Sequence, residues 1–172
     1  MFKLSSVSAT PPVAGQTAPP FTLPSQDGSP VNLEHFRGHW VLLYFYPKDN
    51  TAGCTIEAHN FQRDLAKYES LNAVVLGVSL DSQNSHQSFC AKQGLTFRLL
   101  SDTGSRVSAQ YGSLRNILGL KMAVRNSFLI DPAGTIAKAW LGVSPANHSA
   151  QVLTVLKELS LQQSAVAQPS PQ

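Results

Sequence analysis

One cysteine of this chain stands where a sulfur nucleophile would be expected. The apolar, aromatic run 41–46 ends at Pro47, a short polar loop follows, and helical periodicity begins near Thr51, so Cys54 falls in the first helical turn. Backbone N–H groups at a helix N-terminus are unpaired and the helix dipole is positive there, which favours a thiolate. Because the thiolate is the nucleophilic form, the pattern predicts attack by sulfur on an electrophile.

A plainer interpretation of these residues is also open. Cys54 begins an apolar stripe that continues through Ala58, Phe61, Leu65 and Tyr68, and free cysteine commonly packs as a small hydrophobe. Thr51 precedes Cys54 by three residues, so it could simply cap the helix or aim its hydroxyl at whatever Cys54 attacks. Position alone does not choose between a reactive and a structural cysteine.

The other cysteine, Cys90, lies beside Phe89 in a predicted helix over 81–93. Asp81 and Ser82 are N-cap candidates for this helix, and Gly94 is a natural residue to end it. Packing in the core with Phe89 is the plain interpretation of Cys90. The first half of the helix is rich in Ser, Gln, Asn and His and has few apolar anchors, so we expect an element of low local stability.

Strands and helices alternate around these two cysteines. The runs 41–46 and 73–80 are apolar on both faces, as in central strands covered on each side. Further strands are predicted at 97–100, 127–130 and 135–140, with an earlier pair at 21–23 and 31–33, and helices at 53–68, 81–93 and 146–161. The pattern predicts an α/β fold with a mixed sheet of about five strands and helices on both faces.

Length and composition fit one domain. The 172 residues match the usual size of a single domain, which we place at 15–161. A Ser-, Pro- and Ala-rich N-terminal tail at 1–14 is expected to be flexible, and a C-terminal tail at 162–172, which has almost nothing to bury, is expected to be disordered. The net charge is +3, but the 13 basic residues are scattered, so nucleic acid is not an expected partner. No apolar run reaches membrane-spanning length, and no membrane partner is expected.

The default location is the cytoplasm, where two cysteines are more often reactive or inert thiols than a permanent disulfide. The N-terminus lacks the apolar core of a secretory signal. A transit peptide stays open as an alternative, because residues 1–16 contain serine and no acid, although they carry only one basic residue.

The segment from Tyr44 to Thr55, Tyr-Phe-Tyr-Pro-Lys-Asp-Asn-Thr-Ala-Gly-Cys-Thr, resembles the active-site signature of peroxiredoxins, in particular the bacterioferritin-comigratory or Q-type subfamily. The likeness covers about residues 13–160. It includes the segments 15–21, 77–82, 99–102 and 125–131. The resemblance implies a thioredoxin-like fold and the reduction of hydroperoxides by a peroxidatic cysteine, with no metal or other cofactor.

Carried over residue by residue, Cys54 matches the nucleophile, Thr51 and Pro47 its flanking positions, and Arg125 the active-site arginine. Pro47 fixes the loop and has no N–H to compete for the peroxide. Arg125 offers a permanent positive charge to the thiolate and to the oxygen that becomes negative as the O–O bond breaks. We also expect Phe21, Phe45 and Met122 to line a substrate pocket.

Many Q-type members have a second cysteine five residues after the nucleophile, where this chain has His59, for which a structural or solvent-facing role is expected. The resemblance to a subgroup with the resolving cysteine in the next helix implies Cys90 for that role. A Cys54–Cys90 disulfide needs Cα atoms within about 7 Å, so local unwinding is expected unless the reduced fold already provides this distance. Relatives imply thioredoxin as reductant and a monomer.

Four other interpretations compete with this one. A thiol–disulfide oxidoreductase would need Cys-x-x-Cys, but Cys54 is followed by Thr-Ile-Glu. A metal site fails because the five histidines show no paired zinc-type spacing. A one-cysteine peroxidase with a structural Cys90, and a non-enzymatic redox-sensing or chaperone-like module that uses Cys54, both stay open. The sequence does not choose between hydrogen peroxide and organic hydroperoxides as the preferred substrate.

Overall fold

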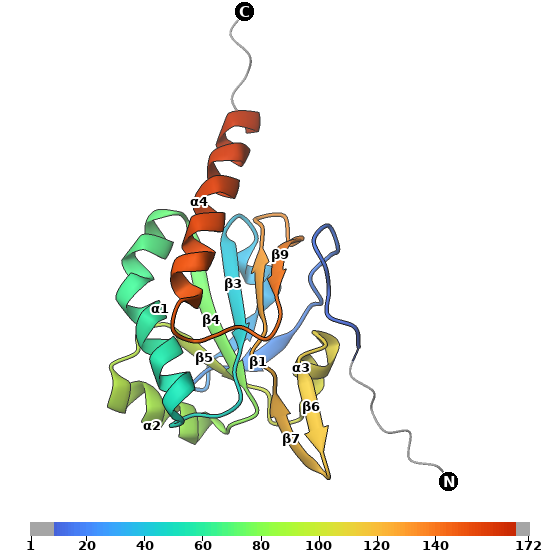
Figure 1. Cartoon of the computed structure of the whole chain (residues 1–172), viewed down its shortest axis with the longest axis vertical. Coiled ribbons are helices and arrows are strands. Elements are labelled where there is room, and N and C mark those ends of the chain that lie inside the picture. Colours follow the sequence, from blue (N-terminus) through green and yellow to red (C-terminus); the bar gives the residue numbers. More distant parts are fainter. Residues whose placement is uncertain (1–8, 168–172) are drawn as a thin grey trace, which may run out of the picture.

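The computed structural model describes residues 9–167 as a five-stranded sheet flanked on both faces (Figure 1). The strand order is β5-β4-β3-β8-β9. The strands are β3 (Trp40–Phe45), β4 (Ala73–Ser79), β5 (Arg98–Ser101), β8 (Ser127–Ile130) and β9 (Ile136–Trp140). Strands β3, β4 and β5 run parallel, while β8 and β9 are antiparallel to their neighbours, so the predicted mixed sheet is confirmed.

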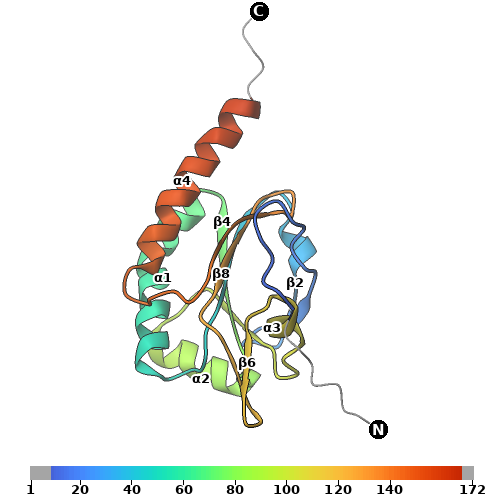
Figure 2. The same cartoon turned by 45° about the vertical axis from the view of Figure 1, so that its right-hand side comes forward.

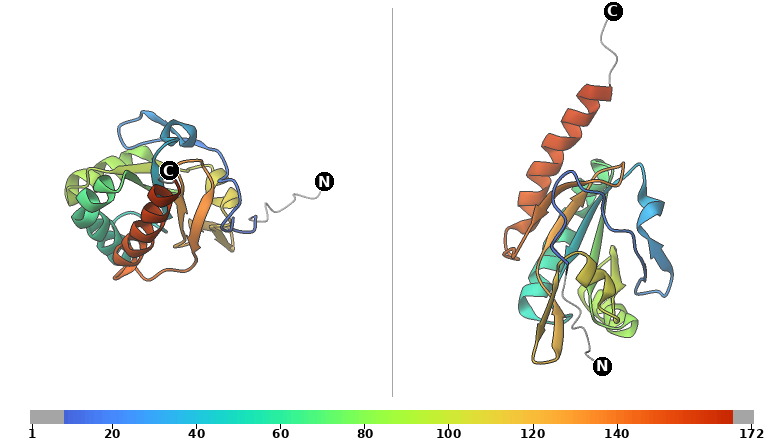
Figure 3. Two further views of the ribbon diagram at one scale, coloured as in Figure 1. Left: turned by 90° about the horizontal axis from the view of Figure 1, so that it is seen from above. Right: turned by 90° about the vertical axis from the view of Figure 1, so that its right-hand side faces the viewer.

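The central strand β3 is buried along its whole length, and its alternate side chains supply two separate cores. Trp40, Leu42 and Tyr44 face the three long helices, whereas Val41 and Leu43 face the opposite side. The three helices are α1 (Ala52–Ser70), α2 (Gln83–Gln93) and α4 (His148–Ala167). The second face is covered by smaller elements: β1 (Thr22–Pro24), β2 (Pro30–Asn32), η1 (Leu33–Phe36) and α3 (Arg106–Gln110). Figure 3 shows these two layers on either side of the sheet.

Helix α1 forms where its apolar stripe predicts. Cys54, Ala58, Phe61 and Tyr68 are all buried, with Leu65 packed against the same core. Helix α2 begins after Ser82, whose hydroxyl accepts a hydrogen bond from the Ser85 backbone N–H, and ends at Gly94 with φ +67°. Both ends of α2 follow the prediction.

A hairpin of β6 (Leu114–Ile117) and β7 (Leu120–Ala123) was not predicted, and neither were α3 and η1. Helix α4 runs to Ala167, six residues beyond the predicted end at 161, so the predicted disordered tail is helical over 162–167. Ala9, in the predicted N-terminal tail, donates from its backbone to the Ala109 carbonyl at 3.0 Å. The remaining parts of both predicted tails, 1–8 and 168–172, lie outside the described residues. Within 9–167 no helix is long and apolar enough to cross a membrane.

Candidate active site

Cys54 lies in the first turn of α1, just beyond the carboxyl end of β3, as predicted. The loop 46–51 leads from the strand, and the first helical bond runs from the Thr55 N–H to the Thr51 carbonyl at 3.0 Å. Cys54 is only 2% exposed and belongs to the core between the sheet and the helices. The interpretation of Cys54 as a core side chain is therefore confirmed, and its place in the first turn of α1 agrees with the position predicted for a nucleophile.

Arg125 reaches this sulfur from the segment just before β8, the strand that pairs with β3. Its Nη2 lies 3.5 Å from Cys54 Sγ. The backbone just before β8 fixes this position, because the Phe45 N–H donates to the Asn126 carbonyl at 2.8 Å and the Val143 N–H donates to the Arg125 carbonyl at 2.9 Å. Residues 71 positions apart thus meet at one edge of the sheet, and a fixed positive charge faces the sulfur.

Gly53 makes the approach of Arg125 possible. A Cβ at this position would lie 3.1 Å from Arg125 Nη2 and 3.5 Å from the Pro145 ring. Gly53 directly precedes Cys54 near the exposed start of α1, and its backbone is not left-handed, so its role is to leave room for the guanidinium.

Glu57 is a site residue that the sequence analysis missed. Its carboxylate accepts from Arg125 Nη1 at 3.2 Å and is 1% exposed. Burial raises the pKa of Glu57 to about 7, although the charge and hydrogen bond of Arg125 act in the opposite direction. The second oxygen, Oε2, has no hydrogen-bond partner among the described residues. The spacing of three residues from Cys54 on one helix face was the available signal.

Thr51 and Pro47 flank the cysteine in different ways. Thr51 occupies the N-cap position, but its hydroxyl makes no capping bond and instead donates to the Lys48 carbonyl at 2.9 Å. The cap predicted for this side chain is therefore absent, and its hydroxyl braces the loop. Pro47 is half-buried and forms part of a groove beside the site.

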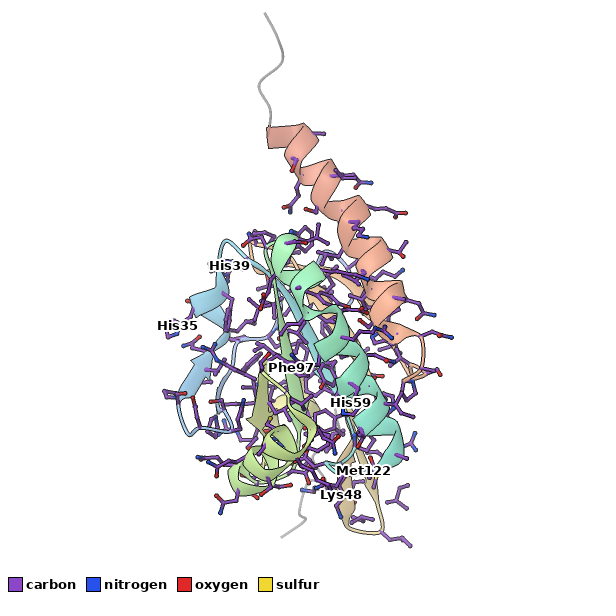
Figure 4. All side chains as sticks on the ribbon, turned by 90° about the vertical axis from the view of Figure 1, so that its left-hand side faces the viewer. His35, His39, Lys48, His59, Phe97 and Met122 are labelled. Atoms are coloured by element: carbon purple, nitrogen blue, oxygen red, sulfur yellow. The ribbon has the colours of Figure 1, made fainter. Side chains whose placement is uncertain are left out.

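That groove has a volume of about 280 Å³ and lies between the site and the β6–β7 hairpin. It is lined by Pro47, Arg115, Met122, Ala123, Val124, Arg125, Gly142 and Val143. Figure 4 shows Lys48 and Met122 close together at this end of the molecule. The prediction of the residues that line the pocket is partly wrong. Met122 lines the groove, whereas Phe21 and Phe45 are buried in the core on the opposite face of the sheet.

Cys90 is buried in the same core as Cys54, and both thiols are free. The Tyr44 ring belongs to that core and packs against Phe61 with centroids 4.7 Å apart. Burial, with a smaller contribution from the Asp49 charge, raises the pKa of Cys90 to about 11. In the folded protein Cys90 is therefore a neutral thiol and a poor nucleophile.

Helix α2 is held to the active-site loop by a buried polar network around Asp49. His86 Nδ1 lies 2.7 Å from the Asp49 carboxylate, and Tyr46 and Ser85 donate hydroxyl bonds to it at 2.6 and 2.8 Å. Burial tends to raise the pKa of Asp49, but the charge and hydrogen bond of His86 outweigh it and leave the pKa below its usual value. The other ring nitrogen of His86 lies 3.0 Å from the Leu100 carbonyl, so the ring joins the loop, α2 and β5.

Among the described residues, the same network contains the one group of side chains that could hold a metal ion. Asp49, Asp81 and His86 each offer one atom within 4.8 Å of the others. These atoms are already bonded within the protein, since the Asp81 carboxylate accepts from the Asp49 N–H at 2.9 Å and the Ser79 hydroxyl at 2.6 Å. We assign the cluster a structural role.

The remaining histidines lie outside the reaction site. The exposed His59 bonds the half-buried Gln93 side chain at 2.8 Å and so links α1 to the end of α2. Figure 4 shows His35 and His39 on the far side of the molecule from Lys48 and Met122. His148 is buried against the Ser127 hydroxyl at 2.8 Å, and burial lowers its pKa to about 4.

Comparison with known proteins agrees with this geometry. Residues 14–139 match the AhpC/TSA family model. A putative peroxiredoxin bcp of Coxiella burnetii is 44% identical over 143 residues, which cover 81% of this chain and 95% of that protein. A solved peroxiredoxin Q variant of Xylella fastidiosa is 34% identical, with a TM-score of 0.82 over 88% of this chain and 99% of that one.

A second solved structure is that of the Xanthomonas campestris bacterioferritin comigratory protein, described for its alkyl peroxide reduction activity. It is 35% identical, with a TM-score of 0.79 over 86% of this chain and 99% of that chain. The family match, the identities and the thioredoxin-like fold agree, so this chain belongs to the AhpC/TSA family, in its Bcp and peroxiredoxin Q branch, and is a peroxidase.

Proposed function

We propose that this chain reduces hydrogen peroxide and organic hydroperoxides with Cys54 as the peroxidatic residue. The observation that carries the proposal is the Arg125 guanidinium 3.5 Å from Cys54 Sγ, at the start of a helix and beside an open groove. The Cys54 thiolate attacks one peroxide oxygen and the O–O bond breaks, giving sulfenic acid. The other oxygen keeps the bonding electron pair, takes a proton and leaves as water or an alcohol.

The surrounding residues have different roles in this step. Arg125 stabilises the thiolate and the oxygen on which negative charge develops. Glu57, on the same face of α1 as Cys54, accepts from the other guanidinium nitrogen and holds the guanidinium in place. Pro47 shapes the groove without offering an N–H, and Thr51 braces the loop through Lys48.

In the second step, we propose, Cys90 is the resolving residue. Its sulfur attacks the Cys54 sulfenic acid, forms an intramolecular disulfide and releases water. Both sulfurs lie in one core but on different helices, and Cys90 is held there as a neutral thiol. We infer that α2 opens locally before resolution, which exposes Cys90 to water and lets it ionise.

An external dithiol completes the cycle, and thioredoxin is the reductant that we propose. Thiol–disulfide exchange returns both cysteines to thiols through a mixed disulfide. The working state that we propose is a cytoplasmic monomer, in keeping with two free thiols. Organic hydroperoxides fit the groove, whose lining combines Met122 and Val143 with two arginines, and the Xanthomonas relative is described as reducing alkyl peroxides.

Intact mass and non-reducing peptide mapping after one equivalent of hydrogen peroxide test this cycle. We expect a Cys54–Cys90 crosslinked peptide in the wild type and trapped sulfenic acid at Cys54 in Cys90→Ser. Oxidation of wild-type Cys54 to sulfinic acid with Cys90 still free would leave a one-cysteine peroxidase. Disulfide formation without turnover by a dithiol reductant would favour a redox-sensing module, and an unreacted Cys54 would overturn the assignment of the nucleophile.

A further inference from the structure

The β6–β7 hairpin extends from the body of the protein and ends in exposed apolar side chains. In Figures 1 and 2 it projects past the sheet at the end of the molecule where α1 begins. Ile117 is 57% exposed, Leu120 is 65% exposed and Leu118 is fully exposed at 103%. Three large apolar residues within four positions of a protruding turn form a continuous apolar tip, which we call the hairpin tip.

Local folding does not explain the leucine at the turn. Leu118 and Gly119 join the strands with φ values of +52° and +86°, as in a type I′ turn. The first of these positions favours Asn, Asp or Gly, since a left-handed backbone is unfavourable for other residues. Asparagine at 118 would suit both the turn and the solvent. Leucine is unfavourable on both counts, so its presence points to a contact outside the monomer.

The charged residues of the hairpin and of its flanking sequence are of one sign. Between Asp102 and Asp131 the sequence has four cations and no acid. Two of the cations, Arg115 and Lys121, are exposed on the hairpin itself. An apolar tip bordered by cations complements an anionic lipid surface, where acyl chains lie beneath a layer of phosphates.

We propose that the hairpin tip docks on anionic phospholipid bilayers. Leu118 and its apolar neighbours enter the interface between headgroups and acyl chains, while Arg115 and Lys121 meet the phosphates. A convex tip with a fully exposed leucine fits a fluid surface that closes around it, whereas a protein partner would have to supply a matching hollow. The contact is peripheral and needs no spanning segment.

The register of the hairpin connects the tip to the groove. Ile117 pairs with Leu120, and two residues further along Arg115 pairs with Met122. Side chains two apart on a strand point to the same face, so the tip and these two groove residues share one face of the ribbon. If the proposed function holds, docking brings the groove toward the membrane, and hydroperoxides on acyl chains are the substrate class that it serves.

Vesicle cosedimentation of the full chain tests the proposal without reference to activity. The probes are vesicles of phosphatidylcholine alone and vesicles with a quarter phosphatidylglycerol. We expect the wild type to bind the anionic vesicles, and high salt to weaken that binding. Leu118→Asn should reduce partitioning about tenfold, the factor that corresponds to removing one leucine from an apolar phase. Lys121→Gln should reduce it on anionic vesicles.

Leu161→Gln is the matched control, because Leu161 is 71% exposed in the second half of α4, a helix that projects from the molecule at the end opposite to the hairpin. It should bind as the wild type does. Leu118→Asn suits the turn, so a folding defect is not expected, and thermal melting and hydrogen peroxide turnover check this. Absence of wild-type binding to anionic vesicles, or equal binding of Leu118→Asn, would overturn the proposal. A variant that binds vesicles normally but is reduced more slowly by thioredoxin would identify the tip as a protein-docking site instead.

The substrate arm compares hydrogen peroxide with phosphatidylcholine hydroperoxide held in anionic vesicles. Leu118→Asn should slow turnover of the lipid hydroperoxide alone. An equal loss of turnover with hydrogen peroxide and with the lipid hydroperoxide would contradict the proposal that docking brings the groove to lipid substrates. A wild type that binds vesicles but reduces neither peroxide would leave the docking surface standing and remove the proposed function.

Discussion

At the scale of single residues, the site depends on how closely a guanidinium approaches a sulfur. Arg125 touches Cys54 with one nitrogen and Glu57 with another. Both helix residues lie on the face of α1 that meets the sheet, and Gly53 leaves the space that the guanidinium fills. A small change in this packing is therefore expected to alter chemistry more than stability.

Gly53→Ala tests that expectation. The added methyl group would lie 3.1 Å from Arg125 Nη2 and force the guanidinium to shift. Weakening one such donor should lower the rate of Cys54 oxidation about tenfold, below the loss seen when an oxyanion donor is removed outright. Alanine is the better helix former by about 0.5–1 kcal/mol, so stability should hold or rise. Stopped-flow peroxide consumption and chemical denaturation separate the two effects, and an unchanged rate would contradict this role of Gly53.

Glu57→Gln tests the buried carboxylate through pH. Because burial raises the pKa of Glu57 from 4.5 to about 7, the folded protein holds a proton there that the unfolded chain has lost. Stability from this group is present below pH 4.5 and is lost as pH rises to about 7, by about 3 kcal/mol in all. His148 has the opposite slope between about pH 4 and 6.5, because its pKa is lowered in the fold.

The pH dependences of stability that Glu57 and His148 produce partly cancel in the wild type, so the variant that lacks the Glu57 carboxyl should show the His148 effect alone. Urea denaturation between pH 4.5 and 7 should show Glu57→Gln gaining stability with pH, because over this range the unfolded chain loses a proton from His148 that the folded chain no longer holds. The free energy of unfolding of the wild type should change less. Parallel curves for the two proteins would show that Glu57 titrates normally.

At the scale of elements, α2 carries the least apolar packing of the three long helices, and polar contacts compensate. Only His86, Phe89 and Cys90 are buried among its eleven residues. His86 joins the helix to Asp49 in the active-site loop and to the Leu100 carbonyl. The polar residues that led us to predict a weakly held α2 include Ser85 and His86, which bond the helix to Asp49.

His86→Ala should release this helix. The substitution removes one hydrogen-bond partner of the buried Asp49 carboxylate and should cost about 1–3 kcal/mol, since Tyr46 and Ser85 still donate to that carboxylate. With α2 opening more often, we expect faster Cys54–Cys90 disulfide formation and less sulfinic acid at high peroxide. Quenched-flow alkylation with mass detection measures both. Gln87→Ala is the control, since Gln87 is exposed on the same helix. A variant whose resolution rate matches that of the control would show that α2 opening does not limit resolution.

The sequence could predict the elements whose residues carry a strong pattern. Strands β3 and β4 are continuous apolar runs, and α1 shows a regular apolar stripe, so each appears within one or two residues of its predicted bounds. The β6–β7 hairpin has exposed apolar residues and no alternation against a core, so periodicity could not reveal it. Cys54 and Arg125 were found through motifs, whereas the Asp49–His86 contact joins polar residues 37 positions apart and has no local signal.

At the scale of the whole molecule, the reaction groups gather at one end. The carboxyl end of β3, the start of α1, helix α2 and the hairpin lie at the end opposite to the projecting part of α4 (Figure 1). The sheet itself is anchored elsewhere, since β8 pairs with both β3 and β9 and Tyr68 bonds the Ser149 carbonyl at 2.9 Å between α1 and α4. One end can therefore rearrange while the rest stays folded.

Hydrogen exchange of the reduced and oxidised protein tests this division. Drawing Cys54 and Cys90 into a disulfide should expose the first turn of α1 and the length of α2, because their sulfurs leave the shared core. Protection should fall in peptides covering 51–56 and 83–93 and stay unchanged in β3, β8 and the buried half of α4. Cys90→Ser treated with one equivalent of peroxide is the control and should keep its protection in α2. Loss of protection throughout the sheet would mean that oxidation unsettles the whole domain, and no loss in α2 would mean that the two sulfurs meet without its opening.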